Sequence, residues 1–179
     1  LIMRITDIFY AFPFLAAAMT LASILGYGVW SAIIALVAFG WMGYARLIRS
    51  EVLRIREMDY VQAARALGVP VYRIILRHVL PNAIWPVFVQ ITMNMGSIVI
   101  TFAALSFLGV GIPQGYADWG QMISYARDWI IGLHGNPLAY WYTFIFPGGA
   151  ITLFCLAWNL LGDALRDILD PRLRGRITV

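Results

Sequence analysis

The residue types that most often carry catalysis or bind metals are scarce in this sequence. It contains two histidines, His78 and His134, and a single cysteine, Cys155. An apolar run long enough to cross a bilayer separates the histidines, so we do not expect them to share a metal or to form a catalytic pair. Cys155 has no second cysteine with which to build a disulfide or a metal site. The phosphate-binding pattern GxxxxGK followed by Ser or Thr is also absent, so ATP hydrolysis would need another polypeptide.

The composition is typical of a membrane protein. Hydrophobic residues make up 61% of the chain and charged residues only 12%, with a mean hydropathy of +0.78, whereas soluble proteins carry about 25% charged residues. All thirteen basic residues are arginines, and nine acids leave a net charge of +4. The arginines cluster beside long apolar runs, where positive charge orients a membrane protein. We therefore predict contact with membrane lipid and not with nucleic acid.

Four apolar runs are candidates for membrane-crossing helices, at 8–25, 29–45, 79–108 and 141–162. The first two form one charge-free stretch that is far longer than the roughly 20 residues a crossing needs. Gly26-Tyr27-Gly28 should divide it, because glycine tolerates the positive φ of a tight turn. In the last run, Pro147-Gly148-Gly149 predicts a kink or a close helix contact. The predicted fold is all-α, a polytopic membrane protein with four transmembrane helices in this chain.

Charge in the connecting segments predicts the orientation. Segment 46–77 holds seven arginines against Glu51, Glu57 and Asp59, whereas segment 109–140 holds only Arg127 against two aspartates. The first segment should therefore be cytoplasmic, which places both ends of the chain on the cytoplasmic side. The outer segment is rich in Trp and Tyr, and the spacing of its apolar residues predicts an interfacial helix, either a membrane anchor or a contact for an outside partner (Trp119, Ile123, Ala126, Ile130).

The predicted cytoplasmic segment, 58–82, reads as a short helix, a stop and a second helix. Asp59 can cap the first helix, and Gly68 followed by Pro70 is a typical helix ending. A helix of about ten residues is marginal in water, so it should dock on something. Its apolar strip, with Ala63 beside it and Arg65 at the rim, could enter a groove on another protein or lie on its own membrane (Tyr60, Ala64, Leu67).

The same segment resembles a known signature. Gln62-Ala63-Ala64, Gly68 and Val79-Leu80-Pro81 are similar, at matching spacing, to the cytoplasmic loop of permease subunits of binding-protein-dependent ABC importers. Gln62 departs from the usual glutamate: it keeps the length and the hydrogen-bonding capacity but not the charge, so no salt bridge is carried over. The resemblance implies that this loop couples to an ATPase through eight residues (Tyr60, Gln62, Ala63, Ala64, Leu67, Gly68, Leu80, Pro81).

Two further segments, 104–111 and 159–173, look like the dipeptide and oligopeptide permease group, specifically its "C" type subunit. The resemblance covers essentially the whole chain and implies a type I ABC importer permease core. It also implies that 1–179 is one permease domain, the C-terminal portion of a subunit with six crossings in a bacterial or archaeal cytoplasmic membrane. The implied partners are a second permease subunit, two cytoplasmic ATPases that hold ATP and magnesium, and an external solute-binding protein. No cofactor is implied for this chain, and the solute could be a peptide, nickel or another small molecule.

Polar residues on one face of the third run could line a translocation path or could hydrogen-bond between helices, since they recur at three- and four-residue spacing (Gln90, Asn94, Ser97, Thr101). The predicted function is solute import by alternating access, driven by ATP bound elsewhere. A carrier coupled to ions or protons is the alternative, although the four predicted crossings lack Asp, Glu, Lys and Arg, which commonly couple such transport. A structural subunit of a membrane assembly is a third possibility.

Overall fold

The computed structural model describes residues 2–110, 112–132 and 140–169, and within these ranges every regular element is helical. The short helices α1 (Ile2–Tyr10) and α2 (Phe14–Leu25) precede the long α3 (Val29–Arg56). The order continues with α4 (Asp59–Ala66), α5 (Val71–Ile74), the π-helix η1 (Ile75–Val79), α6 (Leu80–Phe107), α7 (Trp119–Gly132) and α8 (Tyr142–Leu169). This confirms the all-α prediction for the described residues.

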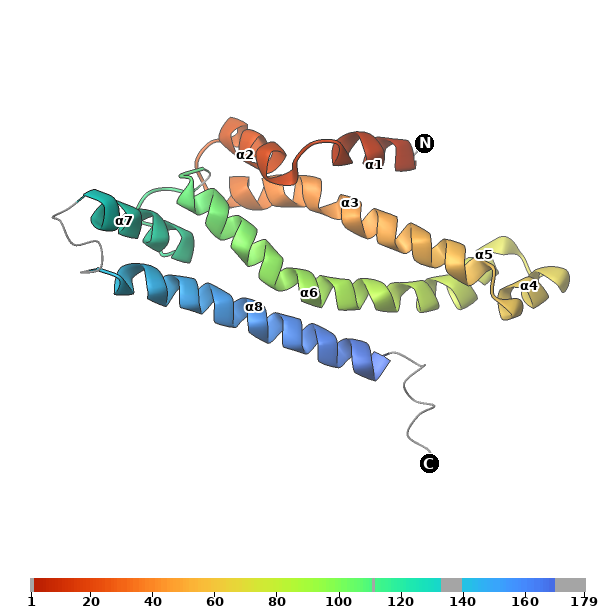
Figure 1. Ribbon diagram of the computed structural model, residues 1–179. Coiled ribbons are helices and arrows are strands. Elements are labelled where there is room, and N and C mark those ends of the chain that lie inside the picture. The colour runs from red at the N-terminus through yellow and green to blue at the C-terminus, as the bar shows by residue number, and fades with distance from the viewer. Residues whose placement is uncertain (1, 111, 133–139, 170–179) are drawn as a thin grey trace, which may run out of the picture.

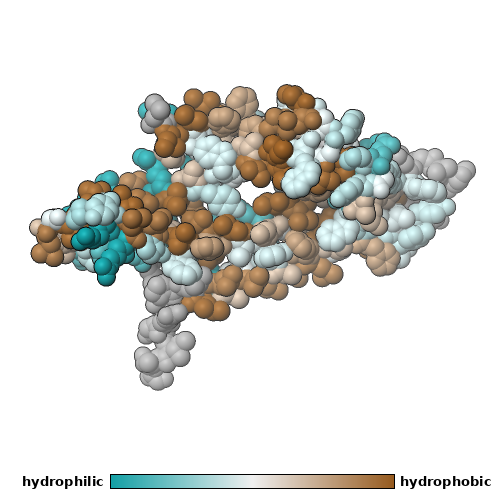
Figure 2. Space-filling model, turned by 180° about the vertical axis from the view of Figure 1, so that it is seen from behind, coloured by the Kyte–Doolittle hydropathy of each residue, from teal (hydrophilic) through white to brown (hydrophobic). Residues whose placement is uncertain are grey.

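Three long helices form the body of the molecule. α3, α6 and α8 run along one common direction, with α4 and α5 at one end and α7 at the other (Figure 1). Each has 28 residues and is therefore about 42 Å long, more than the roughly 30 Å hydrocarbon core of a bilayer. Hydrophobic side chains cover the middle of the face in Figure 2, and hydrophilic ones gather toward the end that carries α4 and α5. Each of the three is thus long and apolar enough to cross a membrane.

The run predicted to cross at 8–25 is not one continuous helix. The chain bends by 91° between α1 and α2, and α2 alone, with 12 residues, is about 18 Å long. The break occurs at Pro13, which has no amide hydrogen and disfavours a helical conformation in the residue before it. The structure therefore has three clear candidate spans, or four if the bent pair counts as one. The predicted division after Leu25 is confirmed, with Gly26 at φ +86°.

The other predicted crossings are extended at their ends. α3 continues past residue 45 through its arginines to Arg56, and α8 continues past residue 162 to Leu169. α6 follows α5 and η1 without a break, so that one helical segment extends over Val71–Phe107. Pro81 lies in its first turn, where the missing amide costs least, whereas Pro86 lies inside the helix.

Small residues bring the long helices together. A Cβ built on Gly96 of α6 would lie 3.0 Å from the Cα of Cys155 on α8, and a Cβ on Gly162 of α8 would lie 2.7 Å from Met93. By contrast, a Cβ on Gly148 or Gly149 would meet nothing within 4 Å. Of the two alternatives predicted at Pro147-Gly148-Gly149, a kink or a close helix contact, these glycines therefore do not make the close contact. Gly96 and Gly162 therefore set the approach of α6 and α8, because small residues let backbones come close in lipid.

The helix predicted around Trp119 is confirmed as α7, and it packs on the span ends. Ala126 is buried, the Trp119 ring lies 6.2 Å from the Phe154 ring of α8, and Ser124 donates a hydrogen bond to the carbonyl of Phe107 on α6. Its apolar residues thus serve at least in part as tertiary contacts within this chain.

Candidate functional site

The segment from Met58 to Asn82 forms a compact structure at one end of the long helices. Its centre is a hydrophobic cluster contributed by the end of α3, by α4, by α5 and η1, and by the start of α6 (Ile55, Val61, Ala64, Ile74, Val79, Ala83). Val61 and Ala83 are fully buried within it. The cluster holds α4 against the ends of both long helices, so displacement of α4 would be passed to α3 and α6.

The turn after α4 is a Schellman motif centred on Gly68. The amide of Gly68 donates to the carbonyl of Arg65 at 2.9 Å, and the amide of Val69 donates to the carbonyl of Ala64 at 3.1 Å. Gly68 has φ +71°, the left-handed geometry that a side chain disfavours. Val69 packs against the cluster that contains Ala64. The predicted helix ending at Gly68 is confirmed.

The start of α4 differs from the prediction. Met58 is the N-cap residue and no side chain caps the helix, so the predicted capping role of Asp59 is wrong. Asp59 is instead the first helical residue, where its negative charge still favours the positive end of the helix dipole. The first amides are satisfied in part by bonds from Val61 and Gln62 to the carbonyl of Met58 within the helix itself.

The side of α4 that is exposed differs from the side predicted to dock on another protein. Ala64 is only 7% exposed and lies with Val61 in the chain's own cluster, whereas Tyr60 and Leu67 are 45% and 83% exposed. The prediction that Tyr60, Ala64 and Leu67 form one free strip is therefore wrong, because α4 uses its Val61–Ala64 side to pack on α3 and α6. The outward surface contains Ala63 and Leu67 instead.

Exposed apolar side chains that the sequence analysis did not single out continue this surface after the turn. Val71 and Tyr72 of α5 and Leu76 of η1 are 70%, 62% and 62% exposed. The sequence could have indicated these residues as a contact surface, because they are apolar and lie in an arginine-rich segment. With Leu67 they form what we call the turn surface (Leu67, Val71, Tyr72, Leu76).

Gln62 holds the end of α3. Its side-chain amide donates to the carbonyl of Arg56 at 3.1 Å and reaches a carboxylate oxygen of Glu57 at 3.5 Å. A glutamate in this place could not donate either bond and would put a second carboxylate beside Glu57. The neutral side chain is thus the one that fits this particular junction.

We expect Gln62→Glu to loosen α4 from α3. Loss of the bond to the Arg56 carbonyl, together with repulsion from Glu57, should cost about 1 kcal/mol. Hydrogen exchange of the α4 amides should then accelerate about fivefold, as read by mass spectrometry on peptides from this segment. Ala63→Glu is the matched control, because it adds the same charge one residue away without removing a bond. Equal exchange in Gln62→Glu and the unmodified protein would show that the side chain does not hold the junction.

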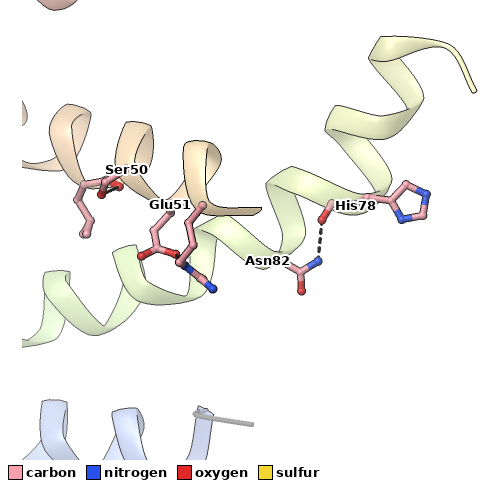
Figure 3. Close-up of polar contacts among 6 residues, drawn as sticks. Ser50, Glu51, His78 and Asn82 are labelled. Atoms are coloured by element: carbon pink, nitrogen blue, oxygen red, sulfur yellow. Dashed lines mark hydrogen bonds and ion pairs between the residues drawn. The ribbon is translucent and has the colours of Figure 1, made fainter. Parts of the chain in front are cut away.

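Leu80 and Pro81 lie where η1 passes into α6. The amide of Leu80 donates to the carbonyl of Ile75, five residues earlier, which is the π-helical pattern. Pro81 cannot donate to Arg77, and Asn82 uses its side-chain amide to donate to the carbonyl of His78 at 2.6 Å (Figure 3). Single π-turns often occur at functional sites. The sequence analysis did not predict this π-helix. The only indication in the sequence was Leu80-Pro81, because a proline within a continuous helix removes one of its backbone hydrogen bonds.

His78 lies against α4. Its ring lies 6.3 Å from the ring of Tyr60, at a tilted angle. In the part of the chain that the structure describes, no three His, Cys, Asp or Glu side chains gather as a potential metal site. His134 lies outside the described residues, as do the arginines after residue 170.

The polar residues of α6 form hydrogen bonds within and between helices. Gln90 donates to Asn94 at 3.0 Å, and Asn94 donates to the hydroxyl of Tyr44 on α3 at 2.9 Å. Thr101 donates to the carbonyl of Ser97, and the Ser97 side chain is exposed. Asn94 thus links α6 to α3, as the prediction of interhelical hydrogen bonds requires, and Gln90 bonds to Asn94 from one turn earlier in α6.

A small cavity of about 340 Å³ lies at the other end of the long helices, between α6 and α7. Its lining includes Ser106, Gln121 and Tyr125 but no charged residue. The Ser106 hydroxyl is buried and has no hydrogen-bond partner among the described residues. The two ends of the bundle therefore differ in chemistry: arginines gather around α4, whereas the cavity beside α7 has a polar lining without charged residues.

Three long apolar helices with a charged, compact turn at one end define a multi-pass α-helical membrane protein. Residues 1–175 match the family of binding-protein-dependent transport system inner membrane components, and the chain belongs to this family. It is 42% identical over 174 residues to a putative peptide transport system permease protein of Brucella suis, covering 97% of this chain and 56% of that protein. It is 40% identical over 176 residues to the glutathione transport system permease protein GsiD of Escherichia coli O6:K15:H31, covering 98% and 55%.

The chain thus spans about half the length of the curated relatives that it matches. Its family and its apolar helices place it in the inner membrane as a multi-pass protein.

Proposed function

We propose that this chain is the C-terminal part of the membrane-spanning subunit of an ATP-driven importer for peptides, and that α4 with the turn surface is its contact with an ATPase. The observation that carries the proposal is the construction of this contact: a short helix, anchored by its own cluster to α3 and α6, with Leu67 exposed beyond it. Family membership supports the same assignment.

The proposed mechanism is mechanical. Two cytoplasmic ATPases bind ATP and magnesium, and their closure displaces α4. The cluster passes this displacement to α3, and through α5 and η1 to α6, so that the subunit and a second permease subunit alternate between outward and inward openings. Ala63, Leu67 and Gly68 supply the shape of the contact, Ala64 acts from inside it, and Leu80 and Pro81 lie where η1 joins α6.

The proposed orientation places the arginine-rich α4 end in the cytoplasm, with both ends of this chain on the same side, in a bacterial or archaeal membrane. Excess arginine on cytoplasmic segments supports this side. The α7 end would then face an external solute-binding protein. The names of the relatives, which mention peptides and glutathione, support a peptide as the solute.

Cysteine cross-linking tests the contact in the full-length subunit assembled with its ATPase. In a Cys155→Ala background, Leu67→Cys should form an adduct with the ATPase, whereas Gln114→Cys at the opposite end should not. The buried Ala64→Cys is a second negative control. Failure of Leu67→Cys, or equal adducts from Gln114→Cys, would contradict the contact. Gradient-driven uptake without any ATPase would instead favour the ion-coupled carrier.

A further inference from the structure

A cleft of about 740 Å³ lies beside α4, between the second half of α3 and the first half of α6, and it reaches the last turns of α8. Its lining changes character along its length. Charged and polar side chains come from all three long helices, and apolar ones come mainly from α3 and α6 (charged and polar: Glu51, Arg54, Asn82, Gln90, Arg166; apolar: Leu47, Ile55, Val89, Met93). Figure 3 shows Glu51 extending from α3 toward α6 on this side of the segment.

The charge in the cleft is net positive. Arg54 donates two hydrogen bonds, of 3.0 and 2.6 Å, to one carboxylate oxygen of Glu51, so this pair is neutral. Arg166 is exposed and forms no ion pair with any described residue. The nearby acids of α8, Asp163 and Asp167, do not line the cleft. Among the residues that line the cleft, Arg166 therefore adds one positive charge to the neutral Glu51–Arg54 pair, and the guanidinium of Arg54 lies beside the same space.

Aromatic side chains around the cleft indicate that it lies at the boundary between the hydrocarbon core and the lipid headgroups. Trp85 of α6 and Tyr60 of α4 line the cleft and are 50% and 45% exposed. Trp and Tyr gather where hydrocarbon meets headgroups, because their rings are apolar and their N–H or O–H groups are polar. The walls formed by Val89 and Met93, with Gln90 as a polar residue between them in the chain, belong to the apolar part of α6. The cleft thus runs from a basic rim into the hydrophobic level of the membrane.

We propose that this cleft binds an anionic phospholipid, with the phosphate at Arg166 and Arg54 and an acyl chain along Leu47, Val89 and Met93. Guanidinium groups bind phosphate oxygens with strong, charge-assisted hydrogen bonds. Basic pockets between transmembrane helices are known to take acidic lipid headgroups. A free anion would match the rim but would leave the apolar walls unfilled. The site does not depend on the ATPase contact, although a lipid here would bridge α3, α6 and α8 next to α4.

The test uses the full-length subunit in its purified complex, supplied with equal amounts of phosphatidylglycerol and phosphatidylcholine of the same chain length. Native mass spectrometry should show preferential retention of phosphatidylglycerol. Arg166→Gln should reduce that preference about fivefold, whereas Arg166→Lys should retain most of it. Arg73→Gln is the matched control, because Arg73 is exposed at the same end but does not line the cleft. Equal retention of both lipids, or an equal loss in Arg73→Gln, would overturn the proposal.

Two further measurements separate a lipid from a free anion. Val89→Trp should fill part of the apolar wall and reduce phosphatidylglycerol retention while leaving both arginines in place. Millimolar inorganic phosphate should not displace the lipid. Unchanged retention in Val89→Trp, or complete displacement by phosphate, would show that the cleft recognises only a free anion. An unchanged thermal midpoint of Arg166→Gln would confirm that the variant is folded.

Discussion

Replacing Gly68 with valine is expected to abolish ATP-driven uptake while leaving the long helices folded. Gly68 has φ +71°, and a β-branched residue there is strained by about 1 to 3 kcal/mol. A Cβ at this position would meet no atom within 4 Å, so the cost is conformational and not a clash. The strain would break the bonds from Gly68 to Arg65 and from Val69 to Ala64, and would displace Leu67 and Val71 relative to α4. Uptake and stimulated ATPase activity in proteoliposomes are the measurements.

The control series for Gly68 uses residues that differ in their tolerance of positive φ. Gly68→Asn should keep most of the uptake, because asparagine adopts the left-handed conformation more readily than other residues with a side chain. Gly68→Ala should be intermediate. If valine, alanine and asparagine all transported at the original rate, the geometry of this turn would have no part in coupling.

The second large effect is expected from Gly120→Ala at the contact between α7 and α6. A Cβ on Gly120 would lie 2.8 Å from the Cα of Ala103, 2.9 Å from its carbonyl carbon and closer still to its carbonyl oxygen. These are backbone atoms, which cannot turn aside as a flexible side chain can. Separating the helices would also expose the buried Ala126 and Gln121. We expect a loss of about 3 kcal/mol in the free energy of unfolding, read as a lower thermal midpoint of the solubilised subunit.

Gly43→Ala is the matched control for Gly120→Ala. Gly43 lies inside α3, and a Cβ there would meet nothing within 4 Å. Alanine in a helix interior should stabilise the protein by about 0.5 to 1 kcal/mol relative to glycine. Opposite signs at the two positions would attribute the loss to the approach of α7 and α6. A loss at both, or at neither, would contradict this explanation.

Hydrophobicity and turn chemistry in the sequence were sufficient for most of the architecture. Long apolar runs identified α3, α6 and α8, because backbone amides in lipid must bond within the helix. Gly68 and Pro70 located the end of α4, since only a few residue types fit a left-handed turn. The signature around Gln62 indicated where function should lie, and membership of the transport family is consistent with it.

The errors at sequence level arose where tertiary contacts decide. Ala64 looked free because a helix face is apolar whether it meets its own chain or another protein. Ala64 is buried with Val61 and Ile55 because α4 packs between the end of α3 and the start of α6, and that arrangement is a tertiary one. Likewise, the glycines of α8 could not be ranked from sequence, and only Gly162 was found in close contact. The bend at Pro13 was missed because the apolar run continues through it.

The sequence by itself thus determined that this is a helical membrane protein, where its three long helices lie, and that a short glycine-ended helix lies between the first two of them. These features are local, since each depends on hydropathy or on the φ preference of a few neighbouring residues. The tertiary structure alone decided which face of α4 is free, that Gln62 donates to the end of α3, and that Arg54 and Arg166 border one cleft. Those relations join residues far apart in the chain, so they depend on how α3, α6 and α8 pack, which no local pattern encodes.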